Sequence, residues 1–337
     1  MSVINPDHKK MILTCDGGGI RGLIIARCLE KLEAIEGKPC HQIFDFMSGT
    51  STGAIIVGAL AVGIPAKQIV QLYLAKGKDI FKKTSNPWNR FFKWTYTKDE
   101  TIKIFQEIYK DTVLKELPVD IMITVKDTVR NETMFFEKKT FGNMLLKEAV
   151  ESSMSAPTYF PPNGRYVDGG VGTFNNTCYQ AAIEAIHYLK YPAGQIRILS
   201  FGTGREISKL KKGEAKKRYK LFWAGYVIGD GMDDANEQQV DFVRREYVST
   251  KEVEFRRYQL SFEEKVFTTL GVPLDKVRDP RVFKMDAVQY LDTLDLVAKK
   301  FAEHIDFTKP QGVELGDKPA LSEQEFSEYC RKNLESN

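Results

Sequence analysis

Two glycine-rich stretches decide the fold: MILTCDGGGIRG at residues 11–22 and IFDFMSGTSTGAIIVGALAV at residues 43–62. Each begins with a short apolar run that predicts a buried strand and continues into glycines that predict a tight loop. Apolar residues at helical spacing follow both loops, at residues 23–35 and 54–62. A strand–loop–helix unit that occurs twice predicts parallel strands joined by crossover helices, and therefore an α/β fold.

The α/β pattern continues to about residue 205 and then changes. Earlier in the chain, the sequence predicts strands at residues 119–126, 132–138 and 196–201 and helices at residues 141–153 and 176–189. Later, residues 236–247 and 286–307 have the spacing of amphipathic helices. No Pro/Gly/Ser-rich linker divides the chain. We therefore expect an α/β domain over residues 10–205 and a mostly helical extension, residues 206–337, packed on it.

The composition is that of a globular protein and argues against a membrane-spanning or disulfide-rich chain. Of the 337 residues, 42% are apolar and 28% are charged, which is typical of globular proteins, and the net charge is +4. No stretch reaches the roughly 20 apolar residues of a membrane span, and residues 1–10 lack the apolar core of a secretory signal. The five cysteines are scattered without a Cys-x-x-Cys pair. This usage indicates a reduced, cytoplasmic protein, and no Cys/His spacing supports a metal site.

Ser51 is the candidate nucleophile. It is the serine of a Gly-x-Ser-x-Gly motif between the second predicted strand and its helix. A sharp turn there exposes the serine oxygen, and the glycines on both sides permit the strained backbone and close helix packing. The following helix N-terminus stabilises negative charge beside the serine. The alternative is a glycine-rich turn without a catalytic role.

The first glycine loop is the candidate oxyanion hole. Consecutive residues Gly17, Gly18 and Gly19 let backbone N–H groups converge on an oxygen anion, and Arg21 could hold an anionic group of a substrate. The spacing also matches the dinucleotide-binding fingerprint, but that motif requires an acidic residue at the end of the second strand. Here the second strand leads into Ser51 instead. We therefore favour the oxyanion hole.

Together these motifs resemble the patatin-like phospholipase family. In that family an Asp-Gly-Gly-Gly loop precedes the Gly-x-Ser-x-Gly serine, and a later Asp-Gly-Gly or Asp-Gly-Ala motif supplies a base. Here the later motif begins at Asp168, with SMSAPTYFP at residues 153–161 before it and FGTG at residues 201–204 after it. The resemblance covers residues 10–205 and implies a three-layer α/β/α fold with a mainly parallel central sheet.

The resemblance also implies a chemistry. Ser51 and Asp168 would form a catalytic dyad that cleaves glycerophospholipid esters through an acyl-enzyme, without a cofactor or a metal. Two alternatives stay open. The order Ser51, Asp168, His304 fits a Ser-His-Asp esterase, although His304 lies in a charged segment typical of a helix surface. A non-catalytic nucleotide-binding module would use the glycine loop alone.

An aromatic and basic segment at residues 81–96 indicates a membrane surface as partner. Aromatic rings suit the headgroup level of a bilayer and lysines suit its phosphates, so we expect contacts from Trp88, Phe91, Phe92 and Trp94. The active protein would then lie peripherally on the inner membrane. A loop whose aromatic rings pack on the core is the alternative, and nothing else in the chain supports binding of nucleic acid. A homo-oligomer is left open.

A second basic segment follows the 201–204 motif. It contains a cluster that could hold an anionic ligand beside the active site, namely Lys211, Lys212, Lys216, Lys217 and Arg218. Some bacterial members of the family are anti-phage effectors that cyclic nucleotides switch on. The resemblance therefore raises the hypothesis of a latent enzyme with a cyclic-nucleotide activator. A solvated charged face is the alternative.

Overall fold

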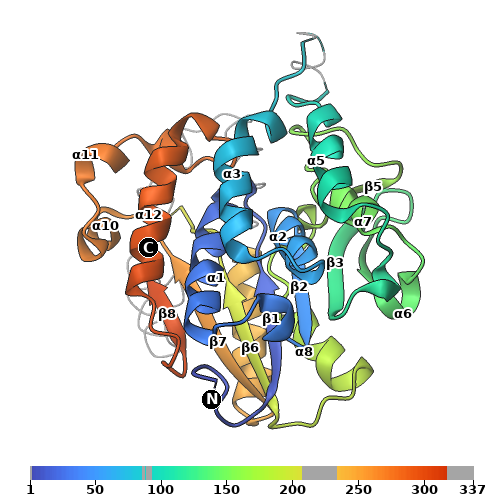
Figure 1. Cartoon of the computed structure of the whole chain (residues 1–337), viewed down its shortest axis with the longest axis vertical. Helices are drawn as coiled ribbons and strands as arrows, with labels where there is room; N and C mark the ends of the chain where they lie inside the picture. The colour runs from blue at the N-terminus through green and yellow to red at the C-terminus, as the bar shows by residue number, and fades with distance from the viewer. Residues whose placement is uncertain (1, 86–87, 89–92, 207–233, 317–337) are drawn as a thin grey trace, which may run out of the picture.

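The structure is a computed structural model that describes residues 2–85, 88, 93–206 and 234–316 (Figure 1). Its centre is an eight-stranded sheet in the order β4-β3-β2-β1-β6-β7-β8, with β5 also paired to β3. The strands are β1 (Lys10–Cys15), β2 (Phe46–Thr50), β3 (Asp120–Asp127), β4 (Glu132–Glu137), β5 (Tyr166–Asp168), β6 (Ile196–Phe201), β7 (Val253–Leu260) and β8 (Gly312–Leu315). Only β4 and β5 run antiparallel to their neighbour β3, so the sheet is mainly parallel.

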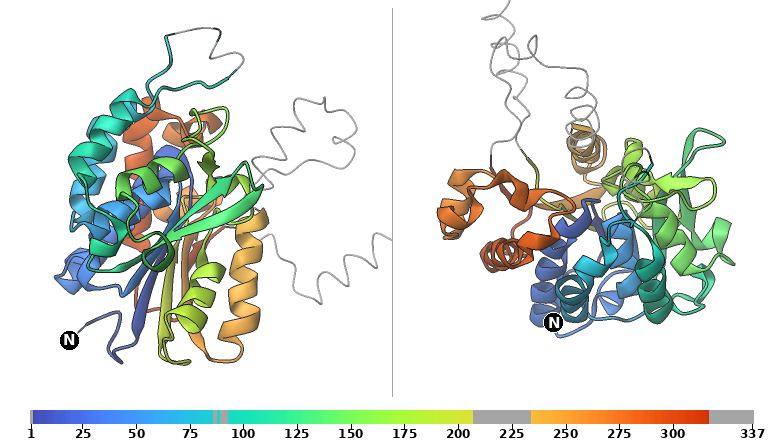
Figure 2. Two further views of the ribbon diagram at one scale, coloured as in Figure 1. Left: turned by 90° about the vertical axis from the view of Figure 1, so that its right-hand side faces the viewer. Right: turned by 90° about the horizontal axis from the view of Figure 1, so that it is seen from above.

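Helices cover both faces of this sheet. They are α1 (Gly22–Glu36), α2 (Thr52–Ala61), α3 (Ala66–Ile80), α5 (Asp99–Tyr109), α6 (Lys138–Phe141), α7 (Leu146–Ser153), α8 (Cys178–Ile183), α10 (Glu264–Leu270), α11 (Leu274–Val277) and α12 (Leu291–His304). Residues 234–242 are also helical and continue into a π-helix, Val243–Val248. Figure 2 shows α8 and residues 234–248 on the opposite side of the sheet from α1 and α3. The expected three-layer α/β/α fold is confirmed.

The alternation of side chains along β1 explains the two cores. Met11, Leu13 and Cys15 point into the larger core, which contains α1, α2, α3 and α12, whereas Ile12 points into the smaller core beneath α8. The side chains on both faces of β1 are apolar because a parallel strand at the centre of a sheet is buried on both faces. Among the described residues, no helix is long and apolar enough to cross a membrane.

One detail of the sequence analysis requires correction. The second strand, expected at residues 43–47, lies at Phe46–Thr50, since residues 40–42 form a 3-10 turn and the backbone N–H of Asp45 donates to Met11. The segment beyond residue 205, expected to be mostly helical, also contributes β7 and β8, which extend the central sheet. The boundary at residue 205 stays a prediction.

Candidate active site

Ser51 occupies a strained turn between β2 and α2. Its backbone has φ 56° and ψ −121°, a conformation that a residue with a side chain rarely adopts. The glycines around it have a steric reason: a Cβ on Gly49 would lie 2.5 Å from the carbonyl carbon of Gly53, and a Cβ on Gly53 would lie 2.1 Å from the carbonyl oxygen of Cys15. The backbone N–H of Ser51 donates to the hydroxyl of Ser153 over 2.9 Å, which fixes the turn.

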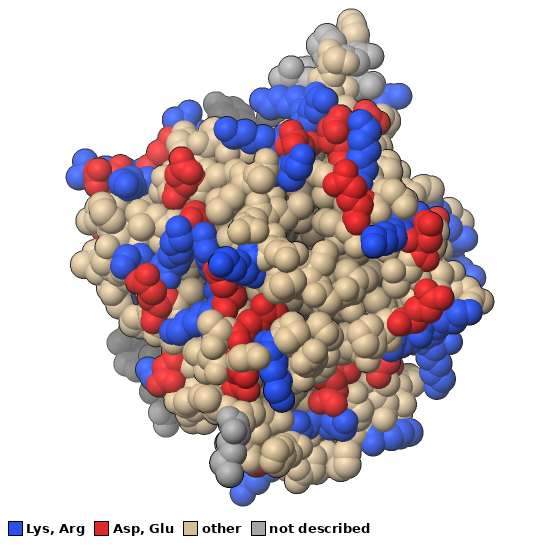
Figure 3. Space-filling view, viewed as in Figure 1, with Lys and Arg blue, Asp and Glu red and all other residues tan. Residues whose placement is uncertain are grey.

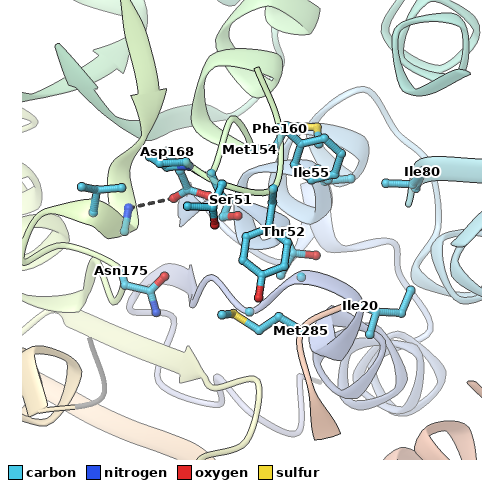
Figure 4. A pocket seen from close by; sticks show the side chains of 18 of the residues that line it. Ile20, Ser51, Thr52, Ile55, Ile80, Met154, Phe160, Asp168, Asn175 and Met285 are labelled. Atoms are coloured by element: carbon cyan, nitrogen blue, oxygen red, sulfur yellow. Dashed lines mark hydrogen bonds between the residues drawn. The ribbon is translucent and has the colours of Figure 1, made fainter. Parts of the chain in front are cut away.

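Strand pairing brings Asp168 to Ser51 from a distant part of the sequence. Strand β2 pairs with β3 as far as Thr124, and β5 pairs with the next residues of β3, so that Asp168 lies opposite Val125. Asp168 is therefore placed just beyond the end of β2, where Ser51 begins the turn. Figure 4 shows the two side chains pointing toward each other.

The environment of Asp168 changes its acidity. Burial raises the pKa of its carboxyl group to about 6, while hydrogen bonds from the side chain of Ser51 and the backbone of Gly170 oppose that rise. The N–H of Gly170 donates to Oδ1 over 2.8 Å, and the N–H of Asp168 itself donates to the carbonyl of Ser155 over 3.1 Å. The carboxylate is thus held in one orientation, with an oxygen directed at the serine.

The glycine loop lies on the other side of Ser51. The N–H of Gly17 donates to the carbonyl of Asn175 over 3.2 Å, and the carbonyl of Gly17 accepts the hydroxyl of Thr203 over 2.8 Å. Gly18 and Gly19 line the cavity beside Ser51. The N–H of Gly17 is thus committed to Asn175, which leaves the amides of Gly18 and Gly19 as the better donors toward a bound anion.

The side chain of Arg21 packs against the glycine loop on the side away from the cavity. Its side chain is buried, its Nε donates weakly to the carbonyl of Gly18 over 3.4 Å, and its guanidinium lies 5.7 Å from the centre of the Phe262 ring. It is not among the residues that line the cavity. The arrangement favours a structural role for Arg21, and a contact with a substrate anion stays a prediction.

A cavity of about 380 Å³ opens beside Ser51 and Asp168. Its wall is mostly apolar and combines α2, α3, the 154–160 segment and the chain before α12 (Figure 4). The apolar side chains include Ile20, Ile55, Ile80, Phe81, Met154, Phe160 and Met285. No histidine of the described residues lines this cavity, and His304 is the exposed last residue of α12. The described residues also contain no group of three His, Cys, Asp or Glu side chains placed to hold a metal.

Several residues of the site carry no local sequence signal. Asn175 lines the cavity with its Oδ1 buried and without a hydrogen-bond partner, and its Nδ2 donates to Gly17 over 3.4 Å. The carbonyl of Met285 accepts the N–H of Ile20 over 2.8 Å. Arg257 of β7 forms a bidentate ion pair with Asp16, at 2.6 and 3.0 Å, directly before the glycine loop. Strand pairing and a contact from far along the chain create these positions, so periodicity could not reveal them.

The structure describes only part of the two surface segments for which the sequence predicts contacts with a membrane or an anionic ligand. Trp88 is 72% exposed, and the ring of the half-buried Trp94 lies 5.4 Å from Nζ of Lys93. The expected contacts Phe91 and Phe92 lie outside the described residues. The same holds for the basic cluster of Lys211, Lys212, Lys216, Lys217 and Arg218. These expectations stay predictions.

Comparison with known proteins finds a family and several relatives that this chain resembles. A model of the patatin-like phospholipase family matches residues 13–182. The chain is 30% identical over 220 residues to the mouse 85/88 kDa calcium-independent phospholipase A2, covering 60% of this chain but only 26% of that protein. It is 26% identical over 249 residues to a cGAMP-activated phospholipase of Pseudomonas aeruginosa, covering 70% of this chain and 74% of the other.

Among solved structures, VipD from Legionella pneumophila is 15% identical with a TM-score of 0.37, covering 86% of this chain and 67% of that chain. That likeness is too loose to refine the fold described above. The family match spans more than half of the 337 residues and includes the serine turn, the glycine loop and Asp168. The chain belongs to the patatin-like phospholipase family.

Proposed function

We propose that this protein hydrolyses acyl esters of glycerophospholipids with Ser51 as nucleophile and Asp168 as base. The observation that carries the proposal is that the Ser51 side chain points toward the buried carboxyl group of Asp168, whose pKa burial raises to about 6. A base with such a pKa is largely ionised at neutral pH yet accepts a proton more readily than an ordinary aspartate. The phospholipase names of the relatives support the substrate class.

The geometry supports a two-step reaction. Asp168 accepts the hydroxyl proton as the Ser51 oxygen attacks the ester carbonyl, and the amides of Gly18 and Gly19 stabilise the oxyanion that forms. When the carbonyl re-forms, the alcohol leaves with the proton from Asp168, and the acyl group stays on Ser51. Water then attacks the acyl-enzyme with Asp168 as base, and the fatty acid leaves as Ser51 recovers its proton.

The apolar cavity accounts for a lipid substrate. Isoleucine, methionine and phenylalanine side chains surround the space beside Ser51, and they would favour an acyl chain over a polar group. Burial of the chain also removes water from the reacting ester, which strengthens the hydrogen bonds to the oxyanion. The exposed Trp88 and the residues near it are proposed to bring this cavity to a bilayer surface.

The dyad is tested by replacement of its two members. Ser51→Ala and Asp168→Asn should each lower kcat on a fluorogenic phospholipid by about 10³-fold or more, because each removes a group that reacts directly. The variants His8→Ala, His41→Ala, His187→Ala and His304→Ala serve as controls and should retain activity. A folded histidine variant with an equally large loss would refute the dyad and support a Ser-His-Asp site.

A second proposal concerns activation. Because 70% of the chain aligns with a protein named a cGAMP-activated phospholipase, we propose that a cyclic nucleotide raises the activity of this protein. The basic cluster at residues 211–218 is the proposed site, by charge complementarity. Purified protein should hydrolyse phospholipid faster with one member of a panel of cyclic di- and trinucleotides, and neutralisation of the cluster should abolish that response. Full activity without any nucleotide, unchanged by the whole panel, would refute it.

A further inference from the structure

A second cavity adjoins the one beside Ser51 and differs from it in charge. It has a volume of about 330 Å³ and is lined by residues of the 81–96 segment and of the chain between α11 and α12. Lys83 and Lys284 contribute its cationic side chains, and neither has an ion-pair partner among the residues that the structure describes. A third cation on the wall, Arg281, is already neutralised by Asp279 at 2.6 Å.

The single carboxylate among the lining residues does not cancel this charge. Asp286 is on the wall, but its Oδ2 accepts the hydroxyl of Tyr96 over 2.6 Å. Among the described lining residues, two lysines without an ion-pair partner and one hydrogen-bonded carboxylate give a net positive charge. Figure 3 shows Lys and Arg side chains interspersed with Asp and Glu near the top of this face, so the charge of the cavity is judged from its own lining residues. A site of this kind favours an anion.

The second cavity is tied directly to the candidate active site. Phe81 lines both cavities, and Met285, which lines the first, stands between Lys284 and Asp286 of the second. The carbonyl of Met285 also accepts the N–H of Ile20 in the turn that follows the glycine loop, over 2.8 Å. Lys284 of the second cavity is therefore the immediate neighbour of Met285, whose carbonyl contacts the turn that follows the glycine loop beside Ser51.

The backbone of the 81–96 segment fixes the other lysine. Lys83 forms an antiparallel bridge with Tyr96, and the N–H of Tyr96 donates to the carbonyl of Tyr159 over 2.8 Å. The ring of Tyr159 borders the first cavity. Both lysines thus come from segments that also build the wall around Ser51.

We propose that Lys83 and Lys284 bind the phosphate of the glycerophospholipid headgroup while the acyl chain occupies the apolar cavity. In such a lipid only the short glycerol backbone separates the ester from the phosphate, so a phosphate site must adjoin the ester site. The two adjoining cavities, one apolar and one cationic, match these two parts of the substrate. This inference rests on the proposed lipid hydrolase activity and adds a determinant of substrate preference.

The test uses two short-chain substrates as dissolved monomers, dihexanoylphosphatidylcholine and dihexanoylglycerol, so that attraction to a bilayer plays no part. The variant Lys83→Ala/Lys284→Ala should lose about tenfold or more in kcat/KM on the phospholipid and stay within about twofold of wild type on the uncharged ester. The variant Lys83→Arg/Lys284→Arg, which keeps both positive charges, should retain most of the wild-type preference for the phospholipid over the uncharged ester. Lys82→Ala is the matched control, since Lys82 precedes Lys83 but lines neither cavity.

Each outcome separates the proposals. If wild type hydrolyses both esters and the alanine variant keeps the same preference, the headgroup site is refuted while the hydrolase activity stands. If wild type hydrolyses neither, the proposed function itself fails, and with it the substrate determinant. Inorganic phosphate is added in a parallel arm. Lysine-dependent inhibition of dihexanoylglycerol cleavage by phosphate, without any change in phospholipid preference, would assign the cavity to a free anion and overturn the headgroup proposal.

Discussion

At the scale of single residues, burial is what makes Asp168 suitable as a base. A solvated aspartate has a pKa near 3.9 and accepts a proton poorly at neutral pH. Here burial raises the pKa to about 6, and the N–H of Gly170 keeps the carboxylate oriented. The sequence motif proposes this residue as the base, and the packing around β5 provides the burial that the proposed role requires.

The pH dependence of the rate follows from this pKa. Because the proposed base, Asp168, can accept a proton only when it is ionised, kcat/KM should rise with pH through about 6 and reach a plateau at about 7 to 8. The measurement is hydrolysis of a soluble ester across this range, with wild type and with the His304→Ala variant. The same profile is expected for both proteins. If kcat/KM instead stayed constant down to about pH 5 and fell only at lower pH, as expected for a carboxylate with an ordinary pKa, the proposed role of Asp168 would be contradicted.

The raised pKa should also cost stability. The folded protein binds the Asp168 proton more tightly than the unfolded chain, so the cost is absent below about pH 4 and complete above about pH 6. A displacement from 3.8 to about 6 corresponds to a cost on the order of 3 kcal/mol. Asp168→Asn should therefore raise the free energy of unfolding at pH 8 by an amount of that order while removing activity. Urea unfolding at pH 8 and pH 4.5 measures it, and an equal gain at both values would speak against a charge effect.

At the scale of elements, the glycine pattern predicted the turns around Ser51 more reliably than it predicted the strands at the edge of the sheet. Gly49 and Gly53 are required by backbone contacts at 2.5 and 2.1 Å, and such contacts leave a fixed motif in the sequence. Strand β7 leaves no comparable signal, since its sequence VEFRRYQL contains two arginines. Arg257 is nevertheless fully buried because Asp16 neutralises it. Strand prediction from apolar runs fails where a buried ion pair replaces apolar packing.

The glycine loop allows a test of its proposed catalytic role. Gly19 has φ +60°, and a Cβ there would lie 2.1 Å from the carbonyl oxygen of Met285, so Gly19→Ala must displace the loop. We expect kcat to fall by about 10²-fold with little change in KM, because the loop amides act on the transition state. Gly271→Ala is the matched control: its φ is +67°, but no atom lies within 4 Å of the added Cβ and the residue is remote from the cavity. A loss confined to KM in Gly19→Ala would indicate a binding loop instead.

At the scale of the whole molecule, the site joins parts of the chain that the sequence presents separately. The motifs at Ser51, Asp168 and the glycine loop are local, so each can be identified in the sequence alone. Met285 and Arg257 come from the segment after residue 205. They contact Ile20 and Asp16, the residues on either side of the glycine loop, because β7 and the chain before α12 pack there. No single-sequence pattern records such packing. The part of the chain outside the family match is thus integral to the candidate active site.

The ion pair between Arg257 and Asp16 tests this dependence of the loop on the distant strand. Arg257→Met leaves the Asp16 carboxylate buried without a partner, which should lower the free energy of unfolding by about 3–5 kcal/mol. The double variant Asp16→Asn/Arg257→Met removes both charges and should recover most of that stability. Its kcat should stay reduced with KM nearly unchanged, because Asp16 no longer anchors the backbone that leads into Gly17. Thermal unfolding and steady-state kinetics on the same preparations distinguish the two effects, and wild-type kcat in the stable double variant would show that Arg257 serves stability without positioning the loop.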